Sequence, residues 1–237
     1  MKILIIGKGN VACNLLQAFR QKDIDTQMVS SREGLDTIAA DRDVYIYAVQ
    51  DKALKAVIDQ VHVSPRALHL HTSGTMPLEV FGEDKKHCGI IYPFQTFSKA
   101  RLIDDFSTVP VFIEARQIDD VSATYTVALT LTPHVFEASQ HDRERLHMAG
   151  VFVNNFPNAL YGIAAKILKE TNIPFSALLP IIDQTALKVH TLTPEQAQTG
   201  PAKRNDTEVM THHLSLLKND KLKQLYQLLS DLIQESN

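Results

Sequence analysis

The sequence predicts an α/β protein, in which a doubly wound, mainly parallel sheet is followed by an all-α domain. Two observations carry this prediction. Short apolar runs alternate with helical patterns through the first half of the chain, and no strand pattern is evident after about residue 140. This change of character predicts one domain over residues 1–139 and a second over residues 140–237.

The first half supplies the elements of the sheet. Its apolar runs predict strands at Ile3–Ile6, Thr26–Ser30, Asp43–Val49, Ala67–His71, Cys88–Phe94, Val109–Ala115 and Thr132–Ser139. Apolar residues at helical spacing predict helices at Val11–Phe19, after Asp51 as the N-cap, and at Asp119–Leu131. Because parallel strands need crossover connections, this alternation indicates βαβ units.

The second half supplies helices. They are expected at Arg143–Glu170, Ile173–Val189, Glu208–Leu217 and Lys221–Ile233. We expect the first of these to bend at Pro157 and the second to kink at Pro180, because proline interrupts the helical hydrogen bonds. The polar segment Thr193–Asp206 is typical of a loop.

Composition and charge exclude several classes of protein. The 24 lysines and arginines against 27 acidic residues give a net charge of −3, which argues against a nucleic-acid footprint. The opening apolar run is shorter than that of a signal peptide, and no stretch reaches the roughly 18 apolar residues of a membrane span. Cys13 and Cys88 are isolated and predict reduced thiols. We expect a cytoplasmic protein that binds neither nucleic acid nor membrane.

The turn after the first strand carries the clearest motif. In GKGNVA, Gly7, Gly9 and Ala12 match the G-x-G-x-x-(G/A) pattern, which binds dinucleotides where it joins a strand to a helix. Gly7 permits the tight turn, Gly9 lets the backbone approach a diphosphate, and Ala12 lets the helix pack on the strand. The sequence therefore predicts a Rossmann-type domain, although a glycine-rich turn without a ligand is the alternative. The predicted cofactor contacts here are Gly7, Lys8, Gly9, Asn10, Val11 and Ala12.

The end of the second strand refines the choice of cofactor. Chains that bind NAD usually place an acidic residue there, and its carboxylate takes the ribose hydroxyls. Here Ser30, Ser31 and Arg32 stand in its place, and these side chains can hydrogen-bond a 2′-phosphate without repelling it. This favours NADP(H) over NAD, with Arg32 as a solvated surface charge as the alternative. Val49 and Gln50, at the end of the third strand, complete the predicted cofactor contacts.

The fourth strand carries two histidines and leads into the segment HTSG. His69 and His71 have no third ligand at a recognisable spacing, so we predict no metal site. Ser73 does not fit the G-x-S-x-G elbow of hydrolases. It does follow the carboxyl end of a strand, which is the edge at which open α/β sheets bind ligands. A turn that uses Gly74 is the alternative.

Several motifs together resemble a known family. GKGNVA, HTSG, YPFQTF (Tyr92–Phe97), AGVFVNNF (Ala149–Phe156) and TGPAKRND (Thr199–Asp206) are similar to those of NADP-dependent oxidoreductases of the Rossmann-like DUF2520 type. Relatives of that family are pyrroline-5-carboxylate reductase, F420-dependent NADP reductases and 6-phosphogluconate-dehydrogenase-like enzymes. The resemblance spans nearly the whole chain. It implies a Rossmann domain, a helical domain that often dimerises, and a cleft between them that binds a small-molecule substrate.

The resemblance leaves the proton source of a reduction open. The wider β-hydroxyacid dehydrogenase group places a catalytic lysine one helical turn before a pair of asparagines, and here Gly150 and Val151 stand at that point. For reduction of a carbonyl or imine, we predict catalytic roles for His71, Ser73 and Asn154, and substrate contacts for Tyr92, Gln95, Asn155 and Arg204. The alternatives are a bent helix for the asparagine pair and a solvated loop charge for Arg204. Asp206 is expected to cap the helix that follows.

The sequence is compatible with three functions of different classes. An NADP(H)-dependent reductase of a small keto or imino compound is favoured. A non-catalytic NADP(H)-binding sensor or regulatory protein is the alternative, because the expected lysine is missing, and a scaffold that dimerises through its helical half is the third. The apolar face of Lys221–Ile233 predicts a homodimer, although an intrachain core would bury the same stripe.

Overall fold

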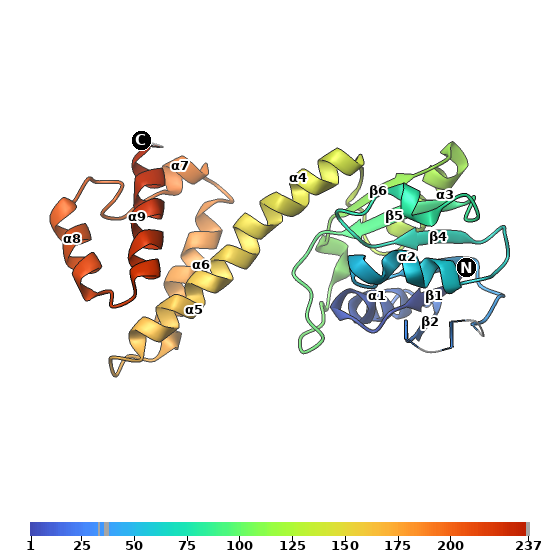
Figure 1. Cartoon of the computed structure of the whole chain (residues 1–237), viewed down its shortest axis with the longest axis horizontal. Coiled ribbons are helices and arrows are strands. Elements are labelled where there is room, and N and C mark those ends of the chain that lie inside the picture. The colour runs from blue at the N-terminus through green and yellow to red at the C-terminus, as the bar shows by residue number, and fades with distance from the viewer. Residues whose placement is uncertain (33, 36–37, 236–237) are drawn as a thin grey trace. The chain divides into compact units, whose positions relative to one another are not determined.

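The computed structural model describes residues 1–32, 34–35 and 38–235. The chain forms two compact units, Met1–Ala159 and Leu160–Asn237 (Figure 1). The first unit holds the sheet, and the second is built from helices. The predicted domain boundary, between residues 139 and 140, coincides with the start of helix α4 (Gln140–Gly150) and stays a prediction.

A seven-stranded sheet with the order β2-β1-β3-β4-β5-β6-β7 forms the centre of the first unit. Neighbouring strands run parallel, except β5 and β6, which are antiparallel. The strands are β1 (Lys2–Ile6), β2 (Asp25–Val29), β3 (Val44–Tyr47), β4 (Leu68–His71), β5 (Cys88–Pro93), β6 (Val111–Ala115) and β7 (Val135–Glu137). The predicted α/β class, with a doubly wound and mainly parallel sheet, is confirmed.

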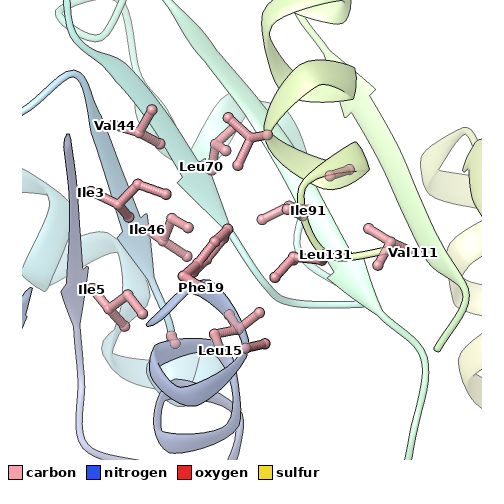
Figure 2. Packing of buried hydrophobic residues seen from close by; sticks show 14 of the residues in the cluster. Ile3, Ile5, Leu15, Phe19, Val44, Ile46, Leu70, Ile91, Val111 and Leu131 are labelled. Atoms are coloured by element: carbon pink, nitrogen blue, oxygen red, sulfur yellow. The ribbon is translucent and has the colours of Figure 1, made fainter. Parts of the chain in front are cut away.

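Helices cover both faces of the sheet, which is why its central strands are apolar on both sides. Successive strand residues point to opposite faces, so Ile3 joins one core cluster and Leu4 the other. Helices α1 (Asn10–Arg20) and α3 (Ile118–Leu129) pack on the first face, and α2 (Asp51–Gln60) packs on the second. Figure 2 shows the α1 side of this packing. Burying one large apolar side chain fully stabilises a fold by about 1.5–3 kcal/mol.

Helix α2 begins differently from the prediction. The N-cap assignment of Asp51 is wrong, because Gln50 holds that position and no side chain caps the helix. Asp51 is the first helical residue, and its carboxylate accepts a hydrogen bond from the Thr75 hydroxyl at 2.7 Å. The acidic group still lies at the positive end of the helix dipole. It also ties α2 to the segment after β4, a contact that the local pattern does not encode.

The predicted bend at Pro157 proves to be a π-helical turn that ends before the proline. This turn, Val151–Asn155, lies between α4 and α5 (Phe156–Leu168), and the Phe156 N–H donates to the Val151 carbonyl across it. Pro157 is then the second residue of α5. Because proline removes one helical donor, the helix can widen beside it at little further cost.

Among its described residues, 160–235, the second unit contains helices and no strand. After α5 it contains α6 (Leu179–Lys188), α7 (Pro194–Ala197), α8 (Thr207–Leu216) and α9 (Asp220–Glu235). The predicted kink at Pro180 is wrong, because this proline lies in the first turn of α6, where its missing N–H removes no helical hydrogen bond. The predicted loop Thr193–Asp206 contains the short helix α7. This helix begins with a capping box formed by Thr193 and Gln196.

The side chains of the second unit are barely buried. Among the described residues 160–235, Ala202 and Ser230 alone are classed as buried. Large apolar side chains that stay exposed there include Ile167, Ile181, Leu187, Leu216 and Leu228. These residues therefore form no closed core of their own. No helix in the described part of the chain is long and apolar enough to cross a membrane.

Candidate functional site

A cavity of about 790 Å³ opens where β1, β2, β3 and β4 end, and we call it the first cavity. It spans the point between β1 and β3 at which the strand order reverses, the usual ligand position in doubly wound sheets. Its lining is Gly7, Lys8, Gly9, Asn10, Val11, Ser30, Ser31, Arg32, Ala48, Val49, Gln50, Ala53, Val57, Thr72 and Lys99. The predicted cofactor residues therefore lie together here, except Ala12, a fully buried residue of α1.

The two glycines of the turn are required for different reasons. Gly7 has a φ of +127°, and a Cβ there would lie 2.2 Å from the Ala48 carbonyl oxygen, so the fold itself demands glycine. Gly9 has a φ of −77°, and a Cβ there would meet only the same oxygen at an ordinary 3.8 Å. The fold does not require glycine at position 9. A side chain at that position would occupy the cavity that a ligand would use.

The amino terminus of α1 faces this cavity and has features that suit an anion. Gly9 is its N-cap, with no side-chain hydrogen bond, and its first turn carries no acidic residue. The N–H groups that open a helix lack partners within it, and its dipole is positive at this end. Together with the room at Gly9, this arrangement fits a phosphate group.

The charge of the first cavity is one-sided. Its described lining contains the cationic side chains of Lys8, Arg32 and Lys99 and no carboxylate. The Ser30 hydroxyl oxygen accepts a hydrogen bond from the Arg32 backbone N–H at 3.2 Å, and this bond closes the turn after β2. Three cations in a described lining that holds no carboxylate favour a ligand with several negative charges.

Lys99 was not predicted, because two asparagines of α1 bring it here across a long sequence distance. The Asn10 side chain accepts the Lys99 backbone N–H at 3.2 Å. One turn later, the buried Asn14 donates to the Ser98 carbonyl at 3.2 Å and accepts the Ile103 N–H at 2.9 Å. A buried asparagine within an apolar helical stripe is the signal that could have indicated such an anchored loop.

A second cavity of about 550 Å³ adjoins the first, since Val11, Val49 and Thr72 line both. The rest of its lining is Asp51, Ser73, Gly74, Thr75, Tyr92, Pro93, Phe94, Gln95, Thr96, Phe97, His147, Gly150, Val151, Val153, Asn154 and Asn155. All of these belong to the first unit. Among them are five residues predicted from the sequence: Ser73, Tyr92, Gln95, Asn154 and Asn155.

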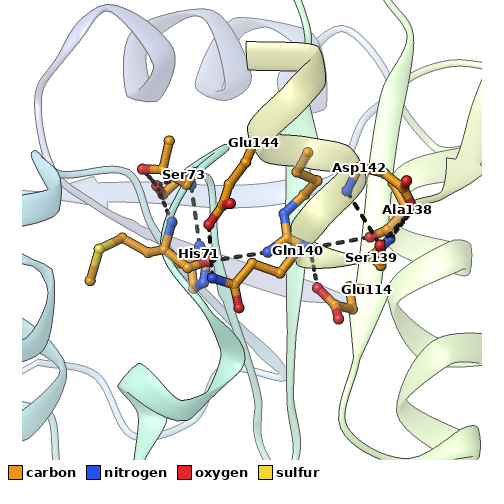
Figure 3. Close-up of polar contacts among 11 residues, drawn as sticks. His71, Ser73, Glu114, Ala138, Ser139, Gln140, Asp142 and Glu144 are labelled. Atoms are coloured by element: carbon orange, nitrogen blue, oxygen red, sulfur yellow. Dashed lines mark hydrogen bonds and ion pairs between the residues drawn. The ribbon is translucent and has the colours of Figure 1, made fainter. Parts of the chain in front are cut away.

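His71, predicted as a proton source, does not line either cavity. Its ring is fully buried and stacks on Phe81, with 5.5 Å between ring centroids. Burial lowers the pKa of His71 to about 4, with nearby Arg143 acting in the same direction, so the ring is neutral near pH 7. Its Nδ1 accepts the Ser73 backbone N–H at 3.2 Å (Figure 3). We therefore assign His71 to holding the turn after β4, not to proton transfer.

Ser73 is also occupied by that turn, although it does reach the second cavity. Its hydroxyl oxygen accepts the backbone N–H groups of Thr75 at 3.1 Å and Met76 at 3.0 Å. This is the hydrogen-bonding pattern of a serine that closes a turn. The turn alternative for this segment is thus seen in the structure, and the catalytic role of Ser73 stays a prediction.

Helix α4 is fixed against the sheet by a fully buried cation. The Arg143 side chain pairs with Glu114 of β6 and donates to the carbonyl oxygens of Ala138 and Met76, each at 3.1 Å. At the start of the same helix, Ser139 and Asp142 form a capping box, which Figure 3 shows beside Glu114. Because the Arg143 guanidinium is buried, losing its partner would leave a buried charge unpaired, so these contacts hold α4 in one position.

Arg204 and Asp206 belong to the second unit. Arg204 lies in the turn after Gly200, where its N–H donates to the Pro201 carbonyl at 3.2 Å, and its predicted substrate contact stays a prediction. Asp206 caps α8, as expected, by accepting the Val209 N–H at 3.2 Å. Among the described residues, no group of three or more His, Cys, Asp or Glu side chains is placed to hold a metal ion.

Comparison with known proteins identifies the family. Residues 109–233 match the model of DUF2520, a domain of unknown function. The chain belongs to the DUF2520 family. No curated protein matches it.

Solved structures agree with this assignment. The "putative NADP oxidoreductase BF3122" of Bacteroides fragilis is 36% identical, with a TM-score of 0.89 over 99% of this chain and 98% of that one. Protein TM1727 of Thermotoga maritima is 20% identical, with a TM-score of 0.73 over 99% and 97% of the two chains. An imine reductase of Myxococcus stipitatus, solved with NADP⁺, is 12% identical, with a TM-score of 0.59 over 99% and 92%. The last two likenesses show the Rossmann-type fold alone.

Proposed function

We propose that this DUF2520 protein is an NADP(H)-dependent oxidoreductase that acts on a small keto or imino compound. One observation carries the proposal. The first cavity reaches the amino terminus of α1 at Gly9, where the fold has no need of a glycine, and it continues into a second cavity lined by polar side chains. A cofactor that spans both would meet a substrate in the second. The Bacteroides fragilis relative supports the proposal through its name.

The residues of the first cavity fit NADP(H). The opening N–H groups of α1 would hold the diphosphate, with Lys8 and Lys99 as the nearby cations. Ser30, Ser31 and Arg32 would hold the 2′-phosphate, because Arg offers paired donors to phosphate oxygens and the described lining holds no carboxylate to repel it. NAD lacks this phosphate, which is why we favour NADP(H). When bound, NADPH supplies the hydride that reduces the substrate.

The second cavity suits a small polar substrate. Gln95, Asn154 and Asn155 offer amide groups that both donate and accept hydrogen bonds, while Phe94 and Phe97 supply apolar surface. Such a mixture orients a carbonyl or imine without requiring a charge on it. Relative to the predicted boundary between residues 139 and 140, residues from both sides line this cavity.

Two measurements with the purified protein test the function. The wild type should bind NADPH in calorimetry and should oxidise it, followed at 340 nm, with at least one member of a panel of small ketones and imines. Gly9→Asp should bind neither NADPH nor NADH, because its carboxylate would occupy and repel the diphosphate position. Binding without turnover would favour the sensor alternative, and a wild type that binds no dinucleotide would contradict the proposal.

Two cations of the first cavity should affect cofactor binding differently: Arg32 should determine the preference for NADPH, and Lys99 should contribute equally to the binding of NADPH and NADH. Arg32→Ala should lower the affinity for NADPH by about 10- to 100-fold. It should lower the affinity for NADH by less than about threefold, since NADH lacks the 2′-phosphate. Lys99→Ala should lower the affinities for NADPH and NADH by the same factor, because both cofactors carry the diphosphate. Titration calorimetry measures these affinities, with the exposed Arg66→Ala as the control. An equal loss of both cofactors in Arg32→Ala would refute the NADP assignment.

We also propose that the protein is a homodimer formed through its helical unit. Residues 160–235 bury almost none of their apolar side chains within the chain, and a second copy offers a matching apolar surface. Sedimentation equilibrium should give twice the chain mass of 26.5 kDa at micromolar concentration. A single-chain mass under those conditions would contradict the dimer.

A further inference from the structure

Tyr92 and His147 meet inside the second cavity. The Tyr92 hydroxyl lies 3.1 Å from Nδ1 of His147, and both residues line the cavity. Tyr92 belongs to the carboxyl end of β5, whereas His147 lies on α4, so the contact joins two elements far apart in sequence. A hydroxyl and an imidazole within hydrogen-bond distance are able to exchange a proton.

The chain makes room for this phenol at a glycine. A Cβ at Gly74 would lie 2.7 Å from Cζ and 2.9 Å from the hydroxyl oxygen of Tyr92, so the phenol would have to shift if position 74 carried a side chain. Gly74 has no positive φ, so its backbone conformation alone does not require glycine. Glycine at this position of the HTSG segment therefore leaves the space that the Tyr92 ring occupies.

The two partners differ in their access to water. Tyr92 is buried, with 9% of its surface exposed, while His147 is classed as exposed. Arg143, one turn earlier on α4, fixes the helix against the sheet and so fixes the imidazole beside the phenol. An imidazole in this position can take protons from solvent and pass them to the largely buried phenol beside it.

The other polar groups of the cavity are less suited to give up a proton. The oxygen of Ser73 accepts two backbone N–H groups in its own turn, and the Asp51 carboxylate accepts the Thr75 hydroxyl. The amides of Gln95, Asn154 and Asn155 hydrogen-bond but do not ionise near neutral pH.

We propose that Tyr92 is the catalytic acid of this site and that His147 returns the proton to it, an inference that rests on the proposed reductase function. Hydride reaches the carbon of the C=O or C=N bond, and the freed electron pair stays on the oxygen or nitrogen. That heteroatom takes the Tyr92 hydroxyl proton as the O–H bond breaks. The Tyr92 oxygen takes the Nδ1 proton of the His147 imidazolium, and the neutral imidazole then regains a proton from water.

The electrostatics of Tyr92 agree with this role. Burial raises the pKa of Tyr92 to about 12, so the hydroxyl keeps its proton until a strong base forms beside it. The charged groups near the pair are Arg143 on α4, which opposes that rise, and Asp51 at the start of α2, which adds to it. A buried phenolate would be costly, which is why a proton must follow from His147 at once.

Two substitutions test the pair with the panel compound that the wild type reduces fastest. Tyr92→Phe should lower kcat by about 100-fold or more while the Kd for NADPH changes less than about twofold. His147→Asn should lower kcat by about tenfold. The pH profile of kcat should differ between the wild type and His147→Asn, since only the wild type carries an ionisable group at this position. Matched controls are Tyr125→Phe, an exposed tyrosine on α3, and His141→Asn, an exposed histidine on α4 outside both cavities.

A readout without turnover checks the contact itself. In ¹⁵N-histidine spectra, the Nδ1 resonance of His147 should move in Tyr92→Phe and stay in place in Tyr125→Phe. Normal turnover in Tyr92→Phe, an unchanged pH profile in His147→Asn or an unmoved Nδ1 resonance would each overturn the inference while leaving the reductase function standing. A wild type that binds NADPH but reduces no panel compound would instead contradict the function, and the inference with it.

Discussion

The left-handed turn at Gly7 is the constraint on which the rest of the site depends. Its φ of +127° and its lack of a Cβ, which would clash with the Ala48 carbonyl, let the chain leave β1 and enter α1 beside the end of β3. The Gly7 N–H donates to Val29 at 3.0 Å, which joins the end of β2 to the same point. Three strand ends and one helix terminus therefore converge here, and the first cavity is the space between them.

Buried polar side chains then hold the parts that complete both cavities. Asn14 fixes the loop that carries Lys99, and Arg143 fixes the helix that carries His147. Each makes several hydrogen bonds to backbone carbonyl or N–H groups, so each specifies one arrangement of segments that apolar contacts alone would leave adjustable. The apolar packing of the sheet stabilises the fold, and these buried polar side chains fix the positions of the Lys99 loop and of α4.

The sheet and the glycine turn after β1 were predictable because both depend on local sequence. A parallel sheet covered on two faces appears as apolar runs, and the turn needs only the spacing of Gly7 and Gly9. Lys99 and His147 were not predictable, because remote asparagine and tyrosine partners bring them to the cavities. His71 was misassigned for a different reason. Its strand ends at the site, but side chains alternate along a strand, and the His71 ring points into the core against Phe81.

The central claim is that glycine at position 9 serves a ligand, whereas glycine at position 7 serves the fold. The direct test is to compare Gly7→Ala and Gly9→Ala by thermal unfolding and by NADPH titration. Gly7→Ala should lose about 5 °C or more in Tm, or fail to fold, since it adds strain and a clash with the backbone. Gly9→Ala should keep its Tm within about 3 °C yet bind NADPH at least about tenfold more weakly. Wild-type NADPH affinity in Gly9→Ala, or a loss of stability equal to that of Gly7→Ala, would contradict the account.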